Sequence, residues 1–339
     1  MKKNILLLVA SAALLASCGS NSAVPAAPTV KEEVKASAVS EAATKALNKV
    51  IEAKGLTLDF GVDLEVAGKT TLPGANLGMT EETVELNEKI ALKDLTVKEV
   101  ASIKDGKLVA SGTLGGAVNA ELTLPKMPTE EGGKVTLEKK NLNLKLDAKD
   151  YLADDVLYLD GSGLFDAYKQ IADIATSYGA RVEGPTKADD MKVKGALPEG
   201  SCASFAGALA SLSAYVPQVT GFIEGLAADE SVKFAKFSDG SFGVELDALK
   251  YAVAMGVIPT GYDLSGCTAK ATITFAEAGK VNAYAELSGK TTIELDGQNV
   301  EVEAKGKISL GLAVGDVTVA TVSNPDSYTE VPLSGILPR

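Results

Sequence analysis

The sequence predicts an α+β, β-rich fold in which a few helices cover a large antiparallel sheet. The first observation is a two-residue alternation of apolar and polar side chains, as from Leu56 to Val66, which is the period of a half-buried strand. The second is that turn sequences such as Asp105-Gly106 separate consecutive runs of this kind. Strands so close in sequence pair antiparallel, and helical periodicity is confined to a few stretches.

The N-terminus has the features of a bacterial export signal. Lys2 and Lys3 precede an apolar stretch that runs from Ile5 to Ala16. A transmembrane helix needs about 20 apolar residues, so this stretch fits the central part of a cleaved signal peptide instead. We therefore predict that residues 1–17 are removed during export.

The run Leu15-Ala16-Ser17-Cys18 resembles the bacterial lipobox, in which the cysteine is acylated and becomes the new N-terminus. The resemblance implies diacylglycerol and palmitate chains on Cys18, and two or more chains anchor a protein stably. We predict a lipoprotein on the extracytoplasmic face of the cell envelope, with the membrane as a partner. Gly19 is not the Asp that retains some enteric lipoproteins, so inner and outer membranes both stay open. The alternative is an ordinary signal peptide cleaved before an unrelated cysteine.

Residues 18–35 are predicted to form a flexible tether, because they are rich in Ser, Ala and Pro and show no apolar face. A single α+β domain is predicted over 36–339, with two smaller stacked domains as the alternative. Helical spacing predicts helices from Ser37 to Lys54, from Leu164 to Tyr178 and from Leu249 to Met255.

A helical insertion is predicted at about 163–228. In its second part apolar residues recur at spacings of four and three, and Pro217 is expected to kink this helix or divide it in two. The recurring residues are Phe205, Leu209, Leu212, Val216, Val219, Ile223 and Leu226.

The remaining alternating runs are predicted strands, with Asp154-Asp155, Gly115-Gly116 and Gly289 among the turns. Before the helical insertion they cover 56–66, 92–103, 108–114, 118–124, 142–146 and a hairpin over 151–160. After it they cover 232–234, 242–246, 268–275, 281–287, 291–295, 300–304, 308–314 and 317–322.

The composition argues against several classes of function. The chain has no histidine, which removes the commonest general base and transition-metal ligand. It has 33 Lys and Arg against 45 Asp and Glu and no concentrated basic run, so nucleic acid is not an expected partner. No nucleophile elbow, phosphate-binding loop or cysteine cluster occurs, so we predict no enzyme activity, no cofactor and no metal site.

Two cysteines, Cys202 and Cys267, remain once Cys18 is assigned to lipid. In an exported protein a leftover pair usually forms a disulfide, so we predict a structural bond between them. The alternative is two independently buried small apolar residues.

The pattern resembles the bacterial lipoproteins of the LolA and LprG/LppX type. The likeness depends on the lipobox at Cys18, the helix that leads straight into long strands, and the segment from Tyr151 to Asp160 followed by a helix. It implies a curved sheet, or half-barrel, whose open side is covered by helices. The greater length, the proline-broken helix and the two cysteines depart from that family's pattern.

The resemblance implies that a lipid or other apolar ligand binds between sheet and helices, with the recurring apolar residues of the insertion lining the site. One alternative is that this stripe fills a solid core. Another is a structural or protein-interaction lipoprotein without a ligand cavity, and the sequence does not identify a protein partner.

Overall fold

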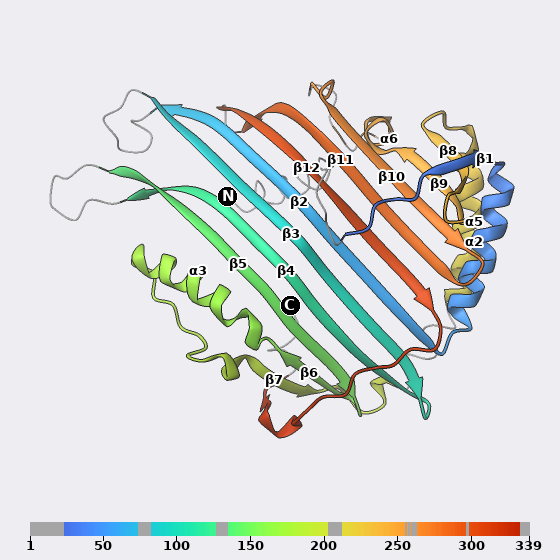
Figure 1. Cartoon of the computed structure of the whole chain (residues 1–339), viewed down its shortest axis with the longest axis horizontal. Coiled ribbons are helices and arrows are strands. Elements are labelled where there is room, and N and C mark those ends of the chain that lie inside the picture. The colour runs from blue at the N-terminus through green and yellow to red at the C-terminus, as the bar shows by residue number, and fades with distance from the viewer. Residues whose placement is uncertain are drawn as a thin grey trace.

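The computed structural model describes residues 24–73, 83–126, 135–202, 212–254, 256, 258, 263–295 and 298–332. Within these residues thirteen strands form one sheet, shown in Figure 1. In spatial order they are β1 (Val30–Glu33), β8 (Val232–Phe237), β9 (Phe242–Asp247), β10 (Cys267–Ala276), β11 (Lys280–Leu295), β12 (Gln298–Val314), β2 (Gly55–Pro73), β3 (Thr83–Lys104), β4 (Lys107–Lys126), β5 (Thr136–Ala153), β6 (Val156–Asp160), β7 (Lys192–Ala196) and β13 (Thr329–Glu330). All neighbours pair antiparallel except β7 and β13, so the predicted α+β, β-rich class with a large antiparallel sheet is confirmed.

The described α-helices are α2 (Ala36–Ile51), α3 (Phe165–Ser177), α5 (Val216–Gly225) and α6 (Ala248–Ala254). All four overlap helices that the sequence predicted. Pro217 stands in the first turn of α5, where its missing N–H costs no hydrogen bond, and a 3₁₀ turn, η4 (Leu212–Tyr215), precedes it. The expected break at this proline is therefore confirmed.

Two tight hairpins have the predicted turns. Asp105 and Gly106 have φ values of 52° and 78°, and Asp154 and Asp155 have 51° and 58°. Two consecutive residues with positive φ match the right-handed twist of the flanking strands, and Asp and Gly tolerate that conformation best. These turns pair β3 with β4 and β5 with β6.

The prediction of a turn at Gly115-Gly116 is wrong, because β4 runs through it as one strand. Lys93 pairs with Ala117 and Thr96 pairs with Gly115, so two residues of β3 oppose Gly116 alone. This is a β-bulge, and Gly116 has φ 133°. A Cβ on Gly116 would lie 2.7 Å from the Cα of Leu95, so only glycine fits there without displacement.

Other strand predictions are corrected in the same way. Gly289 is not a turn but pairs with Cys267 inside β11, and the predicted strands 300–304 and 308–314 are both parts of β12. Residues 317–322 form no strand. The predicted tether also proves partly ordered, because Val30–Glu33 is strand β1 at one edge of the sheet.

The register divides the sheet into two chemically different faces. Residues that pair across strands share a face, and successive residues alternate. The apolar face carries the row Phe234, Val244, Ile273, Ala283, Leu310, Phe60, Val97, Leu114 and Ala148. The polar face carries the neighbouring row Thr274, Asn282, Gly311, Asp59, Lys98, Thr113 and Lys149.

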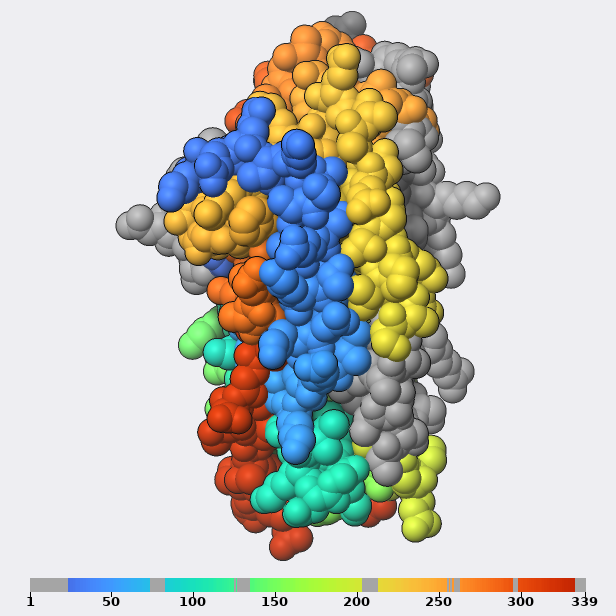
Figure 2. Space-filling model, turned by 90° about the vertical axis from the view of Figure 1, so that its right-hand side faces the viewer, coloured from blue at the N-terminus to red at the C-terminus, as the bar shows by residue number. Residues whose placement is uncertain are grey.

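Helices α2 and α5 pack on the apolar face at one end of the sheet. Their buried residues, including Val39, Ala43 and Ile223, form a core with Val244 and Phe275. Figure 2 shows α2 and α5 side by side along this end. Burial of these aliphatic side chains stabilises the packing by about 1.5–3 kcal/mol for each large one.

At the opposite end of the sheet, strand β6 and helix α3 together cover the outer edge of β5. Strand β6 pairs with β5 from Lys149 to Ala153, and α3 lies alongside the part of β5 beyond it, as Figure 1 shows. The side-chain amide of Gln170 donates a hydrogen bond to the main-chain oxygen of Asn143 at 3.1 Å. A covered edge strand cannot pair with another chain, so α3 limits aggregation there.

Two extended segments cross the polar face. The segment before β1 brings Val24 over Gly61 and Ser309, and Val24 is 2% exposed. The segment after β12 runs across the ends of β2 to β5, where the N–H of Ala320 donates to the hydroxyl of Ser111 at 3.0 Å. Figure 1 shows both segments in front of the strands.

Replacing Gly116 with alanine should lower the free energy of unfolding by about 1–3 kcal/mol, because the new Cβ would collide with backbone in a strained conformation. Chemical denaturation would measure the loss. Gly115→Ala is the matched control, since its nearest contact is Thr96 Oγ1 at 3.6 Å. Equal stability of the two variants would contradict the assignment of the bulge.

Candidate functional site

The apolar face stays partly open over the central strands. Ile90 on β3, Ile273 on β10 and Leu310 on β12 are 46%, 41% and 43% exposed. Apolar residues scattered singly on a surface are ordinary, but these three share one face with rows of half-buried aliphatic side chains. We take this surface, defined by Ile90, Ile273, Leu310 and their neighbours Phe60 and Val97, as the candidate site.

The residues predicted to line a ligand site occupy a different place. Val219, Ile223 and Leu226 belong to the core that α2 and α5 make with β8 to β10, as the solid-core alternative expects. Val216 begins α5 and is half-buried, and Leu212 begins η4. Phe205 and Leu209 lie outside the described residues. The open apolar surface is formed by strands and not by the helical insertion, where the resemblance placed it.

A pair of carboxyl groups interrupts the apolar face. Glu99 on β3 and Asp150 on β5 both pair with Gly112 of β4, so the three residues form one row. A Cβ built on Gly112 would collide with an oxygen of each carboxyl group. Glu99 and Asp150 therefore lean over the glycine and hydrogen-bond to each other.

The surroundings of this pair favour a retained proton. Burial, the charge of Asp150 and the shared hydrogen bond raise the pKa of Glu99 from 4.5 to about 7. Burial also raises the pKa of Asp150, while the hydrogen bond with Glu99 lowers it. The raised pKa of Glu99 thus favours one proton shared by the pair near neutral pH, beside the aliphatic side chains of Val97 and Leu114.

The sequence contains a signal for this pair. Glu99 stands between Val97 and Ala101, and Asp150 stands between Ala148 and Leu152, at positions where the alternation demands apolar side chains. Two such breaks, opposite the same glycine, become meaningful once the register is known.

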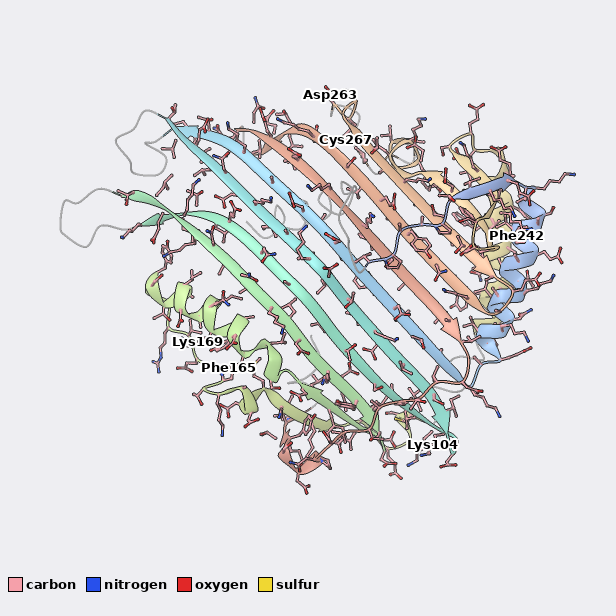
Figure 3. All side chains as sticks on the ribbon, viewed as in Figure 1. Lys104, Phe165, Lys169, Phe242, Asp263 and Cys267 are labelled. Atoms are coloured by element: carbon pink, nitrogen blue, oxygen red, sulfur yellow. The ribbon has the colours of Figure 1, made fainter. Side chains whose placement is uncertain are left out.

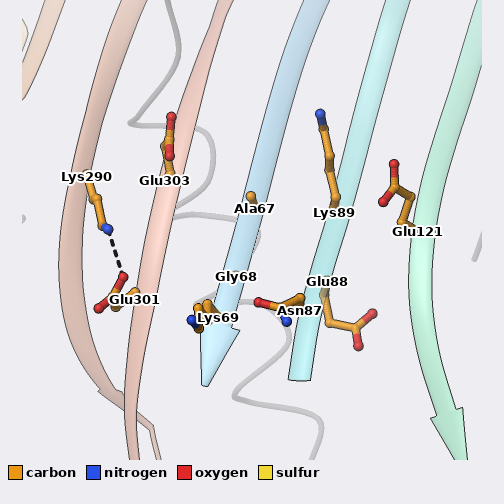
Figure 4. A pocket seen from close by; sticks show the side chains of 10 residues that line it. All are labelled: Ala67, Gly68, Lys69, Asn87, Glu88, Lys89, Glu121, Lys290, Glu301 and Glu303. Atoms are coloured by element: carbon orange, nitrogen blue, oxygen red, sulfur yellow. Dashed lines mark ion pairs between the residues drawn. The ribbon is translucent and has the colours of Figure 1, made fainter. Parts of the chain in front are cut away.

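Besides a hollow of about 750 Å³ under the segment after β12, the polar face has two shallow hollows of about 310 and 320 Å³ over β2, β3, β4, β5, β11 and β12. Figure 4 shows the first, where Lys290 and Glu301 form an ion pair of 2.7 Å. In the second hollow, the Nζ of Lys89 lies 3.0 Å from Oε1 of Glu65, and the Nζ of Lys305 lies 3.5 Å from the same oxygen. Burial alone would raise the pKa of Glu65, but the hydrogen bond from Lys89 and the neighbouring lysine charges lower it overall.

Charged side chains of both signs line these two hollows. Their charges alternate in sign, so exposed ion pairs compensate one another and each contributes little to stability. Among the described residues no group of three or more His, Cys, Asp or Glu side chains could hold a metal ion.

The predicted disulfide is wrong, because Cys202 and Cys267 are both free and buried. The N–H of Cys202 donates to Asp155 at 2.9 Å in the turn between β5 and β6, whereas Cys267 begins β10 (Figure 3). Seven steps in strand order separate β10 from β6, which is roughly 34 Å at the usual spacing. Burial raises the pKa of both thiols, which keeps them unreactive.

The comparisons with known proteins do not assign a family. No family model matches the chain, and no curated protein matches it. Among solved structures, the crystal structure of the beta domain of the Bordetella autotransporter Brka aligns at 7% identity and a TM-score of 0.13. That alignment covers 78% of this chain and 99% of the other, and a likeness so low carries no argument about fold or function.

Over the part of the chain that the structure describes, no helix is both long and apolar enough to cross a bilayer.

The carboxyl pair predicts a pH-dependent stability. Because the folded pKa of Glu99 lies above its unfolded value, the stabilising contribution is complete below about pH 4.5 and is lost as pH rises through about 7. We expect a loss of about 1–2 kcal/mol, less than the full pKa change would give, because water partly screens both carboxyl groups. Denaturant unfolding at pH 5 and pH 8 measures it.

Glu99→Gln should remove most of this pH dependence, because the variant keeps an uncharged hydrogen-bond partner for Asp150. Glu65→Gln is the control, because the pKa of Glu65 is lowered in the folded state and its pH dependence has the opposite sign. Glu65 stabilises the fold at pH values above its unfolded pKa, and this contribution is lost as pH falls. An unchanged slope between pH 5 and pH 8 in Glu99→Gln would contradict the shared proton.

Proposed function

We propose that the chain is a bacterial lipoprotein, anchored through Cys18 at the extracytoplasmic face of a membrane, that binds a lipid or other apolar ligand without catalysing a reaction. The observation that supports ligand binding is the open apolar surface around Ile90, Ile273 and Leu310. The lipid anchor rests on the run from Leu15 to Cys18.

An apolar ligand gains binding free energy when it covers this surface. Each Å² of aliphatic surface removed from water contributes about 25 cal/mol, so an acyl chain laid over exposed strand residues gains stability without new polar contacts. In this proposal the sheet curves as a half-barrel around the ligand, and the carboxyl pair of Glu99 and Asp150 excludes anionic groups from its part of the surface. The binding surface belongs to the strands, and α5 only borders it.

A second candidate is a lipoprotein that binds another protein. Tyr215 and Phe222, at the start and on the outer side of α5, are 56% and 59% exposed. Aromatic residues are enriched in protein interfaces because they bury a large area with few rotatable bonds. Under this second proposal a partner protein covers the apolar surface around Ile90, Ile273 and Leu310.

Cys18→Ser should move the protein from the membrane fraction to the soluble fraction in a bacterial host, because no thiol remains to be acylated. Mass spectrometry of the N-terminal peptide would show the missing lipid. Cys202→Ser is the control, and it should stay in the membrane fraction. Retention of Cys18→Ser in the membrane without lipid would contradict the anchor.

Ligand binding is tested with the Cys18→Ser chain lacking residues 1–17, titrated with a fluorescent long-chain fatty acid or phospholipid. Saturable binding is expected, and Ile90→Glu should weaken it about tenfold or more by placing a charge on the apolar surface. Asn87→Glu, on the polar face of the same strand, is the control and should bind normally.

Absence of saturable binding by the unsubstituted chain would overturn the ligand proposal. Recovery of a stoichiometric protein complex that Ile90→Glu abolishes, together with no lipid binding, would favour the second candidate.

A further inference from the structure

We propose that the polar face of the sheet lies against the headgroup layer of the anchoring membrane, and that the apolar face therefore points away from that membrane. This orientation rests on the proposed lipid attachment at Cys18. It adds to the proposed function the side, relative to the membrane, on which the binding surface lies.

Val24 is the first residue of the described part of the chain. Its side chain is 2% exposed and lies on the polar face, where a Cβ on Gly61 would be 3.1 Å from its Cγ2. Gly61 pairs with Ser309 on one side and with Thr96 on the other. Strand β2 is the seventh of thirteen in spatial order, so the chain enters the structure over the middle strand.

The covalent chain limits how far the anchor can be from this point. Cys18 precedes Val24 by six residues, and a fully extended chain spans at most about 3.3–3.6 Å per residue, or roughly 20 Å in all. The sheet is wider than this, because six strand spacings of about 4.8 Å separate β2 from either edge, or roughly 29 Å.

The same limit applies along the strands. Gly61 is six residues from the first residue of β2, Gly55, and six residues of strand extend roughly 20 Å. The chain from Val24 to Cys18 can therefore just reach the nearer end of β2. It cannot also pass around that end to the opposite face, so the acyl chains must enter the bilayer on the side of the polar face.

The chemistry of the polar face suits this position. Lysine and carboxylate side chains alternate over its open part, as in the pairs Lys69 with Glu85 and Lys290 with Glu301. Phospholipid headgroups also carry separated positive and negative charges in a hydrated layer, so contacts of both signs can form without burying an unpaired charge. The apolar face is then open to ligands or proteins arriving from the side away from the membrane.

The chain has no tryptophan, so a single introduced tryptophan is a unique reporter. Asp59 and Leu310 form a matched pair of positions, because Asp59 pairs with Gly311 on the polar face and Leu310 pairs with Phe60 on the apolar face. Both side chains are exposed. Asp59→Trp and Leu310→Trp thus report on the two sides of one point in the sheet.

The lipidated full chain with either substitution is reconstituted into phosphatidylcholine vesicles that contain a nitroxide on the lipid headgroup. Fluorescence of Asp59→Trp should be quenched about twofold or more relative to Leu310→Trp. Lengthening the segment between Gly19 and Val24 by twenty Gly and Ser residues should remove the difference while vesicle binding persists. Equal quenching in the unlengthened proteins, or stronger quenching of Leu310→Trp, would overturn the orientation.

Flotation of the vesicles separates this proposal from the one on which it rests. Protein that does not float lacks a lipid anchor, which contradicts the proposed attachment and not the geometry. In that case Cys18 is coupled to a maleimide phospholipid, and the same comparison of the two tryptophans decides the orientation.

Discussion

The pairing register of the long central strands is the constraint on which the other features depend. Because paired residues share a face, one row through Phe60 and one row through Asp59 extend across many strands without mixing. A slip of one residue in any pair would carry aliphatic side chains into water and charges into the helical core. The bulge at Gly116 preserves this arrangement where β3 has one residue more than β4.

The two faces are used in opposite ways. On the apolar face, α2 and α5 close one end, while Leu310 on β12 and Ile90 on β3 stay exposed farther along the sheet. On the polar face, segments from both ends of the described chain cross the strands, one over Gly61 and the other over Ser111. A tether that starts over β2 gives the two faces different access to a membrane, which links the sheet's chemistry to the proposed function.

The carboxyl pair on the apolar face shows how backbone register creates chemistry. Glu99 and Asp150 are 51 positions apart in the sequence, yet both pair with Gly112, whose missing side chain leaves room for them to meet. Desolvation at this position favours the neutral form of Glu99. Such a pair breaks the local pattern of the fold, and departures of that kind tend to mark places where function or regulation resides.

The sequence alone determined the hairpins at Asp105 and Asp154, the four helices and the central parts of most strands, because periodicity and turn chemistry are local properties. It did not predict the short strands β1, β7 and β13. It misjudged Gly116 and Gly289, since a glycine in a bulge or opposite a cysteine looks like a glycine in a turn. Only the tertiary structure decided that Cys202 and Cys267 lie apart, that α5 packs into a core, and that Val24 rests on β2. These depend on strand order, which pairs residues distant along the chain and therefore leaves no local signature.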